Sequence, residues 1–451
     1  MTREGRVSER SAALVVRAAV RHSDPVSTSP AREPLADPAP RGQRWTEEVA
    51  DKRPHARPAE TWSARLLLGV TAMEATEAFH RTHQWHPESH FDLVRAAAGE
   101  RSQPMVLAVE KSGQPCSIVV AQVVDAVVPW RVGYGTLGSS RARVLEVLRG
   151  GLLGDQSAAS LEFVCDRLRA SMRELGVDAI VVRHVIEGSA AHRVFVQRPG
   201  WFCRDRLGVV SANGRLTVPR VFAEFLAAQP KRERDDNRRY EKRIRREFGE
   251  SVRVERLAGP ADVERFTNVV ESIARKTWQR GFGAGFRATP QERARWALAA
   301  ERGFLRVDVL WLGDEPVAFC TGFAVGSTLW LEHIGYDPEY RRLRPGIFLV
   351  HRIVERLAGE GRLRAIDFGI GDAEYKRRLC DTWCTEITVW VFAPTVRGLW
   401  LNGVRSVTNG LYRLGYRVLE RCGLLEPLKR RWRRALEPRK PDEFDESPAA
   451  G

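Results

Sequence analysis

The feature that most constrains how this 451-residue chain can fold is a weak internal duplication. Residues 104–124 (PMVLAVEKSGQPCSIVVAQVV) and 305–325 (LRVDVLWLGDEPVAFCTGFAV) each contain two β-rich runs around a Gly-containing turn, which predicts two β-hairpins. The two copies agree in pattern more than in identity, so two α/β units that are similar by chance remain the alternative. After the hairpins we expect, in turn, an amphipathic helix, a strand and a short helix, at 160–176, 178–186 and 188–196 and again at 347–361, 364–370 and 372–379.

The remaining chain divides around these two copies. Seven prolines and a lack of apolar periodicity predict that the N-terminal segment is disordered, and the last residues have a similar composition. A run dense in arginine and lysine joins the two copies, and a proline should break or kink its helix near Pro230. The predicted segments are a disordered 1–58, a first α/β unit at 59–217, a basic linker helix at 218–250, a second unit at 251–395, a basic amphipathic helical arm at 396–437 and a disordered tail at 438–451.

The formal net charge of +15 raises the question of a polyanionic partner. Part of that charge lies in two discrete helical stretches, so we expect no specific nucleic-acid partner. No stretch approaches the ~18 uncharged apolar residues of a membrane span, and the N-terminus has too short an apolar run for a secretory signal. The seven cysteines are scattered, which is typical of a reducing compartment. These features together predict a cytoplasmic protein.

The most informative stretch for chemistry is TLWLEHIGYDPEYRRLRPGIFLVHRIVERL, residues 328–357. It begins as a strand, and Asp337-Pro338 should end that strand because proline cannot donate to a sheet ladder. A short loop with Arg341, Arg342 and Arg344 follows, and Pro345-Gly346 should begin a helix. A basic loop before a helix N-terminus favours an anion, because free N–H groups, the helix dipole and guanidinium groups all attract negative charge.

This order of elements resembles the GNAT superfamily of acyltransferases. The run IDFGIGDAEYKRRL (366–379), the basic linker KRERDDNRRYEKRIRRE and ARKTWQRG (274–281) are similar to the BioF-like/CelD-type acetyltransferase domain, a relative of the FemAB peptidyltransferases. The resemblance covers about residues 60–395 and implies an α/β (α+β) fold of two tandem GNAT-like halves, each a mixed, mostly antiparallel sheet flanked by helices, of which the first is degenerate. The usual phosphate loop is only partly present, as RLRPG (342–346).

The resemblance also implies a donor and its binding residues. The donor would be acetyl-CoA or another acyl-CoA, with its pyrophosphate on the basic loop and the following helix turn and its thioester near the preceding strand. No metal is expected. The cofactor-binding residues that follow are Ile334, Gly335, Arg341, Arg344, Gly346 and Ile347.

Two side chains are candidates for proton transfer in acyl transfer to an amine. Glu332, on the strand that would flank pantetheine, is the candidate base, and the alternative is a half-exposed strand glutamate facing an arginine. Tyr375 is the candidate acid for the departing thiolate, and the alternative is a packing tyrosine. Lys376 and Trp278 are candidates for binding the acceptor, against a solvated lysine and a core tryptophan.

The predicted function is that of an acyl-CoA-dependent N-acyltransferase, in the first place an N-acetyltransferase, acting on an amine of a sugar, an amino acid or an envelope or polysaccharide precursor. Two alternatives remain. One is a FemAB-like transferase that uses aminoacyl-tRNA, and the other is a catalytically silent binding module in envelope-polysaccharide assembly. His80, His83, His86 and His90 resemble metal ligands in spacing, but Pro87 interrupts them and convergent geometry would be needed, so no metal role is assigned.

The C-terminal arm carries an apolar repeat of about 3.5 residues with arginines around it. A helix docked on the second unit, a helix that binds a membrane surface and a helix that forms a dimer all remain open. The residues of the repeat are Trp400, Val404, Val407, Leu411, Leu414 and Val418.

Overall fold

The computed structural model describes residues 61–99, 102–132, 135–257, 259–281 and 285–422. The predicted disordered segments at 1–58 and 438–451, and the end of the predicted arm, lie outside the described residues. All named strands belong to one twelve-stranded mixed sheet with the order β1-β2-β3-β4-β5-β12-β6-β11-β10-β9-β8-β7. The strands are β1 Trp62–Leu68, β2 Ser102–Lys111, β3 Gln114–Val132, β4 Gly135–Gly154, β5 Ala179–Ile186, β6 Val210–Thr217, β7 Val252–Arg256, β8 Leu305–Leu312, β9 Glu315–Val325, β10 Thr328–Tyr336, β11 Ala365–Ile370 and β12 Thr382–Phe392.

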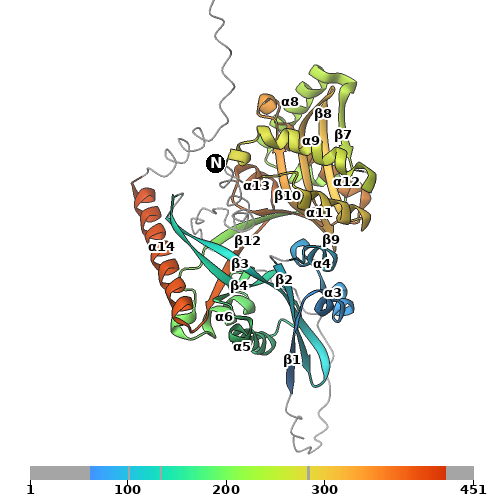
Figure 1. Ribbon diagram of the computed structural model, residues 1–451. Coiled ribbons are helices and arrows are strands. Elements are labelled where there is room, and N and C mark those ends of the chain that lie inside the picture. Colours follow the sequence, from blue (N-terminus) through green and yellow to red (C-terminus); the bar gives the residue numbers. More distant parts are fainter. Residues whose placement is uncertain (1–60, 100–101, 133–134, 258, 282–284, 423–451) are drawn as a thin grey trace, which may run out of the picture.

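The sheet is the sum of two halves with the same order of elements (Figure 1). Both predicted hairpins form, as β2–β3 and β8–β9, and each continues into a third antiparallel strand, β4 or β10, that the sequence pattern did not reveal in the first copy. A helix then crosses to a parallel strand, giving the pairs β4–β5 and β10–β11. The predicted α/β fold of two tandem halves, with mostly antiparallel sheets flanked by helices, is confirmed.

The last strand of each half is exchanged with the other half. β6 follows the first half in sequence but pairs with β11 of the second, and β12 follows the second half but pairs with β5 of the first. β6 and β12 then pair with each other and join the two halves into one sheet. The predicted domain boundaries remain a prediction, and a cut after residue 217 would separate β6 from both of the strands with which it pairs, β11 and β12.

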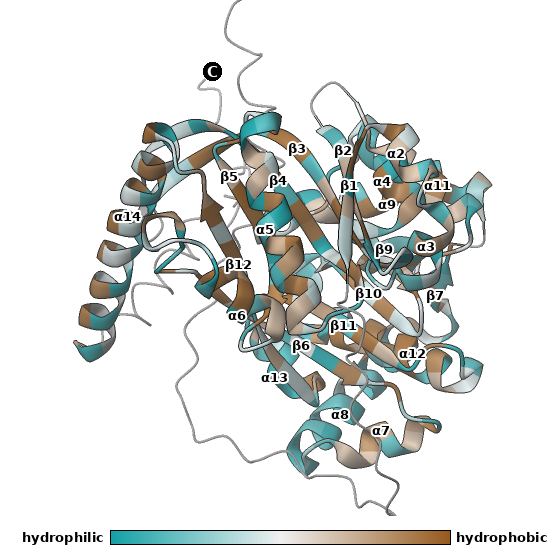
Figure 2. Cartoon of the chain, turned by 90° about the horizontal axis from the view of Figure 1, so that it is seen from below, coloured by the Kyte–Doolittle hydropathy of each residue, from teal (hydrophilic) through white to brown (hydrophobic). Residues whose placement is uncertain are grey.

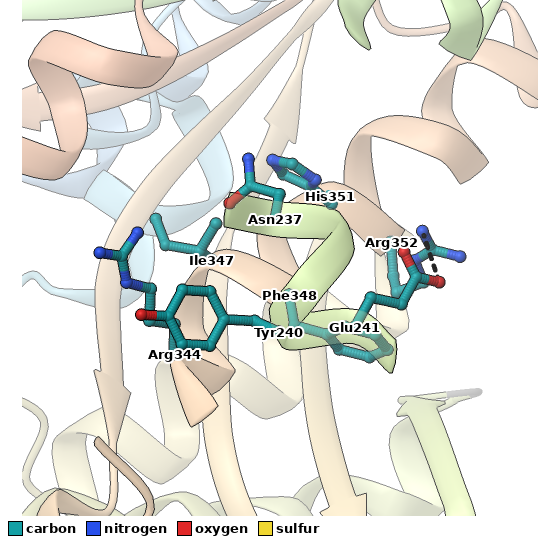
Figure 3. Close-up of a pocket in the computed structure, with 8 residues that line it drawn as sticks. All are labelled: Asn237, Tyr240, Glu241, Arg344, Ile347, Phe348, His351 and Arg352. Carbon is teal, nitrogen blue, oxygen red and sulfur yellow. Dashed lines mark ion pairs between the residues drawn. The ribbon is translucent and has the colours of Figure 1, made fainter. Parts of the chain in front are cut away.

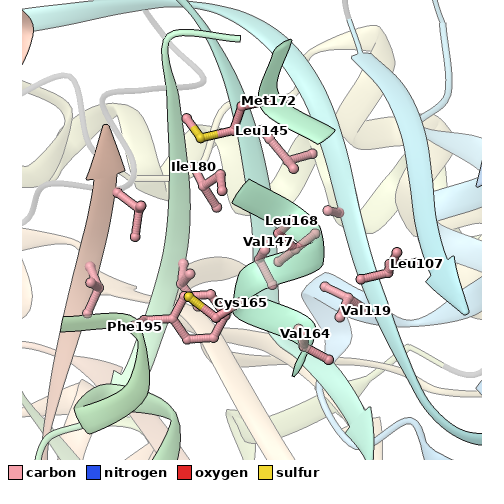
Figure 4. Packing of buried hydrophobic residues seen from close by; sticks show 14 of the residues in the cluster. Leu107, Val119, Leu145, Val147, Val164, Cys165, Leu168, Met172, Ile180 and Phe195 are labelled. Carbon is pink, nitrogen blue, oxygen red and sulfur yellow. The ribbon is translucent and has the colours of Figure 1, made fainter. Parts of the chain in front are cut away.

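Helices cover both faces of the sheet. In the first half α5 and α6 pack on one face, where Leu168 and Phe195 meet Leu107, Val119 and Leu145 (Figure 4). In the second half α12 packs on one face, and α9 and α11 pack on the other. The helices are α2 Val70–Glu74, α3 Glu77–His83, α4 Phe91–Ala96, α5 Ala158–Leu175, α6 Ala190–Gln197, α7 Phe222–Ala228, α8 Lys231–Phe248, α9 Val263–Lys276, α10 Trp278–Gly281, α11 Pro290–Glu301, α12 Pro345–Glu360, α13 Glu374–Leu379 and α14 Val396–Arg421, with short 3₁₀ turns that include η1 Pro87–Ser89, η2 Trp201–Cys203 and η5 Pro338–Leu343.

The predicted linker helix is two helices, as expected from its proline. α7 ends before Gln229, and α8 begins after Pro230, because proline cannot continue the hydrogen-bond ladder of the preceding turn. Within the described residues, no helix combines the length and the apolar content that a crossing of the bilayer requires.

Four buried polar side chains, here called the central charge cluster, join the exchanged strands. Arg149 of β4 donates to Glu386 of β12 at 2.5 Å, and both side chains are only 7% exposed. Asn213 of β6 donates to Glu386 at 3.1 Å and to Asp367 of β11 at 3.0 Å. Burial raises the pKa of Glu386, and the Arg149 guanidinium opposes that rise. Charged groups at this depth need each other, because a buried charge that loses its partner is strongly unfavourable.

We expect Arg149→Met to lower the free energy of unfolding by about 3–5 kcal/mol, because it leaves Glu386 buried without its cation. Urea unfolding followed by far-UV circular dichroism measures the change. The control is Arg65→Met, which breaks the exposed Arg65–Glu110 pair and should cost less than about 1 kcal/mol. Equal unfolding midpoints for the two variants would show that the central charge cluster does not hold the halves together.

Candidate functional site

Strand β10 separates from β11 in the middle of the sheet. Only Thr328, Leu329 and Trp330 pair with β11, whereas β10 runs on against β9 as far as Tyr336. The β9–β10 register shifts between Leu331 and His333, which places a β-bulge at Glu332. One edge of β10 beyond Trp330 is therefore not paired with β11, and residues 331–334 are partly exposed despite their central strand. We call this gap the β10–β11 opening.

The first half has an opening at the equivalent place, but its chemistry differs. β4 pairs with β5 only over Val144–Val147, and the register of β3 and β4 shifts just beyond that point. The residue two positions after the last pair is Arg149, where the second half has Glu332. Arg149 is buried in the central charge cluster, so this position serves the fold in the first half.

The two helices that follow the openings also differ at their N-termini. Ser157 caps α5 by accepting a hydrogen bond from Ser160 N–H, and Asp155 accepts another from Ser157 N–H. The N-terminus of α12 has no side-chain cap. Because an uncapped helix N-terminus presents N–H donors and the positive end of the helix dipole, α12 is the better anion site of the two.

The basic loop before α12 forms the short helix η5, which Asp337 holds in place. Its carboxylate accepts from Lys276 at 2.6 Å and from Glu339 N–H at 3.0 Å, so the strand ends at Asp337-Pro338 as predicted. Arg341 and Arg342 are exposed on η5. The helix α12 begins at Pro345, as predicted, with Gly346 and Ile347 in its first turn.

Arg344 points toward the linker helix (Figure 3). Its backbone is left-handed (φ 51°), and its guanidinium lies 4.6 Å from the ring centre of Tyr240 and 4.0 Å from the Asp236 carboxylate, both on α8. A small pocket between α8 and α12 has this cation–π pair at one end. Burial lowers the pKa of His351, in the same pocket, to about 4. The linker helix is thus part of the surroundings of the predicted phosphate loop.

Glu332 lies in a cluster of ionisable groups that the sequence did not reveal. Arg295 of α11 donates to Glu332, and it also binds Glu292 at 3.0 Å. Glu292, Glu332 and His333 place one ligand atom each within 4.8 Å of one another. Burial raises the pKa of Glu292, the Arg295 guanidinium opposes this, and the Glu332 carboxylate adds to it. Glu332 therefore faces an arginine, as its alternative interpretation as a half-exposed strand glutamate expects, and its role as a base remains a prediction.

Local sequence explains why α11 brings these groups to β10. Thr289 accepts from Glu292 N–H and Pro290 occupies the first turn, so TPQE begins the helix. Glu292 and Arg295 then share one face, three residues apart. The three metal-capable groups could bind a cation, but Arg295 already contacts both carboxyl groups. The predicted absence of a metal remains a prediction.

The other predicted site residues lie in different surroundings. Tyr375 on α13 is half-buried, with its ring 6.2 Å from Phe368, and its role as an acid remains a prediction. Trp278 begins α10, but its side chain lies outside what the structure describes. Ile334 accepts a long hydrogen bond (3.5 Å) from Gln279, and Gly335 lies so close to the Phe319 ring that a Cβ would be 2.6 Å from it.

The alternative reading of Lys376 as a solvated lysine is wrong. Its side chain is buried, and its ammonium donates to the carbonyls of Gly369 at 2.8 Å and Ile370 at 2.9 Å. These bonds fix the end of β11, on the far side of the β10–β11 opening. Lys376 thus has a structural role, and its contact with an acceptor remains a prediction.

The four histidines of the first half act in packing. His80 bonds the carbonyl of Ser89 at 2.7 Å, and His83 bonds that of Phe79 at 2.9 Å. The His86 ring lies 4.4 Å from the Trp330 ring, next to the β10–β11 opening, and the His90 ring lies 4.4 Å from that of Phe304. Among the described residues, the metal-capable group is that of Glu292, Glu332 and His333, and it contains none of these four.

Comparison with known proteins identifies the second half. Residues 231–377 match the family described as "Acetyltransferase (GNAT) domain", which confirms the GNAT resemblance over this part of the chain and includes α8. No curated protein matches the chain.

Solved structures with a similar arrangement include FemX (11% identity over 70% of this chain and 95% of that one, TM-score 0.47). A tandem GNAT protein from the clavulanic acid biosynthesis pathway is 10% identical over 74% of this chain and 99% of that one (TM-score 0.43). The C-terminal domain of a putative lysylphosphatidylglycerol synthetase from Agrobacterium fabrum is 11% identical over 73% and 94% (TM-score 0.44).

The raised pKa of Glu292 predicts a pH dependence of stability. A carboxyl group whose pKa is higher in the folded than in the unfolded state stabilises the fold below its unfolded pKa, and that contribution disappears as pH rises through the folded value. The wild type should therefore lose stability relative to Glu292→Gln as pH rises from about 4 toward neutrality. Urea unfolding of both proteins across this range measures the difference, at about 1.4 kcal/mol per unit of pKa difference. A constant difference would contradict the assignment.

Proposed function

We propose that this chain transfers an acyl group from a coenzyme A thioester to an amine. The observation that carries the proposal is the β10–β11 opening, which leads from a bulge at Glu332 into the basic loop η5 and the uncapped N-terminus of α12. The match of this part of the chain to an acetyltransferase domain supports it. The first half has a capped helix and a buried arginine at the equivalent places, so we assign the donor to the second half.

The donor would lie along the free edge of β10. An extended pantetheine can hydrogen-bond to unpaired strand groups in the way that an added strand does. Its pyrophosphate would meet the first turn of α12, with Gly346 and Ile347, and the guanidinium groups of Arg341 and Arg344. Arg344 would exchange its contacts with Asp236 and Tyr240 for a phosphate, a stronger partner than a carboxylate 4.0 Å away.

The acceptor amine would approach from the face of the sheet that carries Glu332. Glu332, directly or through water, takes the ammonium proton, and Arg295, which donates to Glu332, holds its carboxylate in place. The neutral amine then attacks the thioester carbonyl, backbone N–H groups near Ile334 and Gly335 stabilise the oxyanion, and the C–S bond breaks. The thiolate takes a proton, for which Tyr375 on the β11 side of the opening is our candidate.

The acceptor class we propose is an amine of a sugar, an amino acid or an envelope precursor. A second donor is favoured by one observation, the basic helix α8 beside Arg344, which would suit the phosphates of aminoacyl-tRNA. Donor binding separates these two functions from each other and from a silent binding module.

Acetyl-CoA affinity should fall in the double variant Arg341→Ala/Arg344→Ala. Each lost phosphate contact should cost about 1–3 kcal/mol, as for other hydrogen bonds to charged groups. Isothermal titration calorimetry with acetyl-CoA measures the loss, and Arg253→Ala on β7 is the control, because Arg253 packs on Trp311 at a different edge of the sheet. Unchanged affinity in the double variant would remove the phosphate assignment. Binding of aminoacyl-tRNA but not of acetyl-CoA by the wild type would select the second donor.

Glu332→Gln should lower turnover with little change in acetyl-CoA affinity, because a base acts in the transition state and does not hold the donor. Labelled acetyl-CoA with a panel of amino sugars, amino acids and diamines gives the rate. The low-pH limb of the rate profile should also disappear in this variant. Near wild-type turnover with that limb intact would place the base elsewhere in the cluster, with Glu292→Gln as the next variant to compare.

A further inference from the structure

Helix α14 turns most of its apolar residues away from the protein, whereas a helix that docks on its own protein turns them inward. The inner side of α14 buries one apolar residue, Leu401, and otherwise makes polar contacts: Asn402 donates to the carbonyl of Phe202 at 2.7 Å, and Asn409 donates to that of Leu207 at 3.0 Å. Arg413 donates to the carbonyl of Gly208 at 2.7 Å, and Thr408 is buried. These contacts fix which side of the helix faces the protein.

The opposite side of α14 is apolar. At 3.6 residues per turn, six apolar side chains fall within an arc of about 60° that points away from the polar contacts. They are between 48% and 89% exposed, so the described part of the protein leaves them largely uncovered. Figure 2 shows α14 at the margin of the molecule with hydrophobic residues spaced along its length. We call this set the outer stripe, and its members are Val396, Trp400, Val407, Leu411, Leu414 and Val418.

Further exposed aromatic residues lie near α14, on the side where it contacts η2. Trp201 and Phe202 of η2 are 61% and 70% exposed, and the bond from Asn402 ties η2 to α14. The Trp400 ring also meets Trp130 of β3 at 5.8 Å. Exposed tryptophans beside an apolar stripe are typical of surfaces that meet the boundary between water and lipid, because the ring is apolar and its N–H is polar.

The charge of the arm decides between a lipid surface and a second copy of the chain. α14 contains five arginines and one glutamate, and Arg417 and Arg421 are exposed beside the end of the outer stripe. The sequence then continues to KRRWRR at 429–434. Two such helices packed in parallel would bring their strongly positive C-terminal ends together, and two packed antiparallel would each still carry a net positive charge. An anionic lipid surface complements both the stripe and the charge.

We propose that the outer stripe of α14 binds an anionic membrane surface, with the helix lying in the plane of the interface. The apolar side chains enter the boundary between headgroups and acyl chains, and the arginines meet lipid phosphates. Since the polar side of α14 is fixed to η2 and its neighbours, binding would hold the whole protein in one orientation at the membrane. The proposal does not depend on acyl transfer.

Vesicle flotation with the full chain tests this proposal. The wild type should float with vesicles of phosphatidylcholine containing about one third phosphatidylglycerol, and remain in solution with phosphatidylcholine alone or at high salt. Leu411→Ser/Leu414→Ser should weaken binding by roughly tenfold or more, because it removes apolar surface that lipid would cover. Arg417→Glu/Arg421→Glu should weaken it through charge. Val221→Ser, an exposed apolar residue before α7, is the matched control and should bind as the wild type does.

Two results would overturn the proposal. One is a wild type that stays in solution with the anionic vesicles, or variants that float with these vesicles as well as the wild type does. The other is a dimer in analytical ultracentrifugation without lipid that Leu411→Ser/Leu414→Ser converts to a monomer, which would assign the outer stripe to a second copy. Circular dichroism of each variant confirms that the exposed substitutions leave the fold intact.

Discussion

The bond between Arg149 and Glu386 is the interaction on which the rest of the structure depends. It joins a strand of the first half to the exchanged strand of the second, and Asn213 extends it to Asp367 of β11. Asp367 is also the last β11 residue paired with β10, opposite Trp330, and its other oxygen accepts from Gly369 N–H. Because the β10–β11 opening begins at this pair, the buried charges that join the halves also fix where the candidate site starts. Arg149 and Arg215 approach the Trp330 ring at 5.8 and 5.5 Å and reinforce that point.

Equivalent positions in the two halves carry different residues with different roles. Beyond the last parallel pair, the first half has Arg149, which the exchanged β12 neutralises, and the second has Glu332, which α11 neutralises. The difference is in exposure: the Arg149–Glu386 pair is buried, whereas Glu332 and Arg295 retain access to solvent. A buried pair can only stabilise or specify the fold, whereas a partly exposed carboxylate can exchange protons with a ligand. The capped α5 and the uncapped α12 repeat the same division at the helix N-termini.

The sequence predicts the local parts of this design and not the long-range ones. Both hairpins, the helix break at Pro230 and the strand end at Asp337-Pro338 follow from turn residues and from the conformational limits of proline. The exchange of β6 and β12 does not, because alternation along a strand indicates its buried face but not its neighbour. Glu292 and Arg295 were missed because they reach Glu332 only after α11 folds over the sheet, although TPQE marks where that helix begins. The burial of Lys376 does not follow from the sequence either, because a lysine satisfied by carbonyls resembles a solvated one in sequence.

The direction in which a helix turns its apolar side indicates whether the helix only supports the fold or also binds a partner. α5 and α12 bury their apolar residues against the sheet, as expected when burial of apolar surface holds a helix in place. α14 relies largely on side-chain hydrogen bonds to backbone carbonyls and leaves its outer stripe in water. Each such hydrogen bond contributes only about 1 kcal/mol, so this attachment is weak for its length, and the exposed apolar side is unfavourable in water. A surface that covers the outer stripe removes that cost and stabilises the arm in the same step.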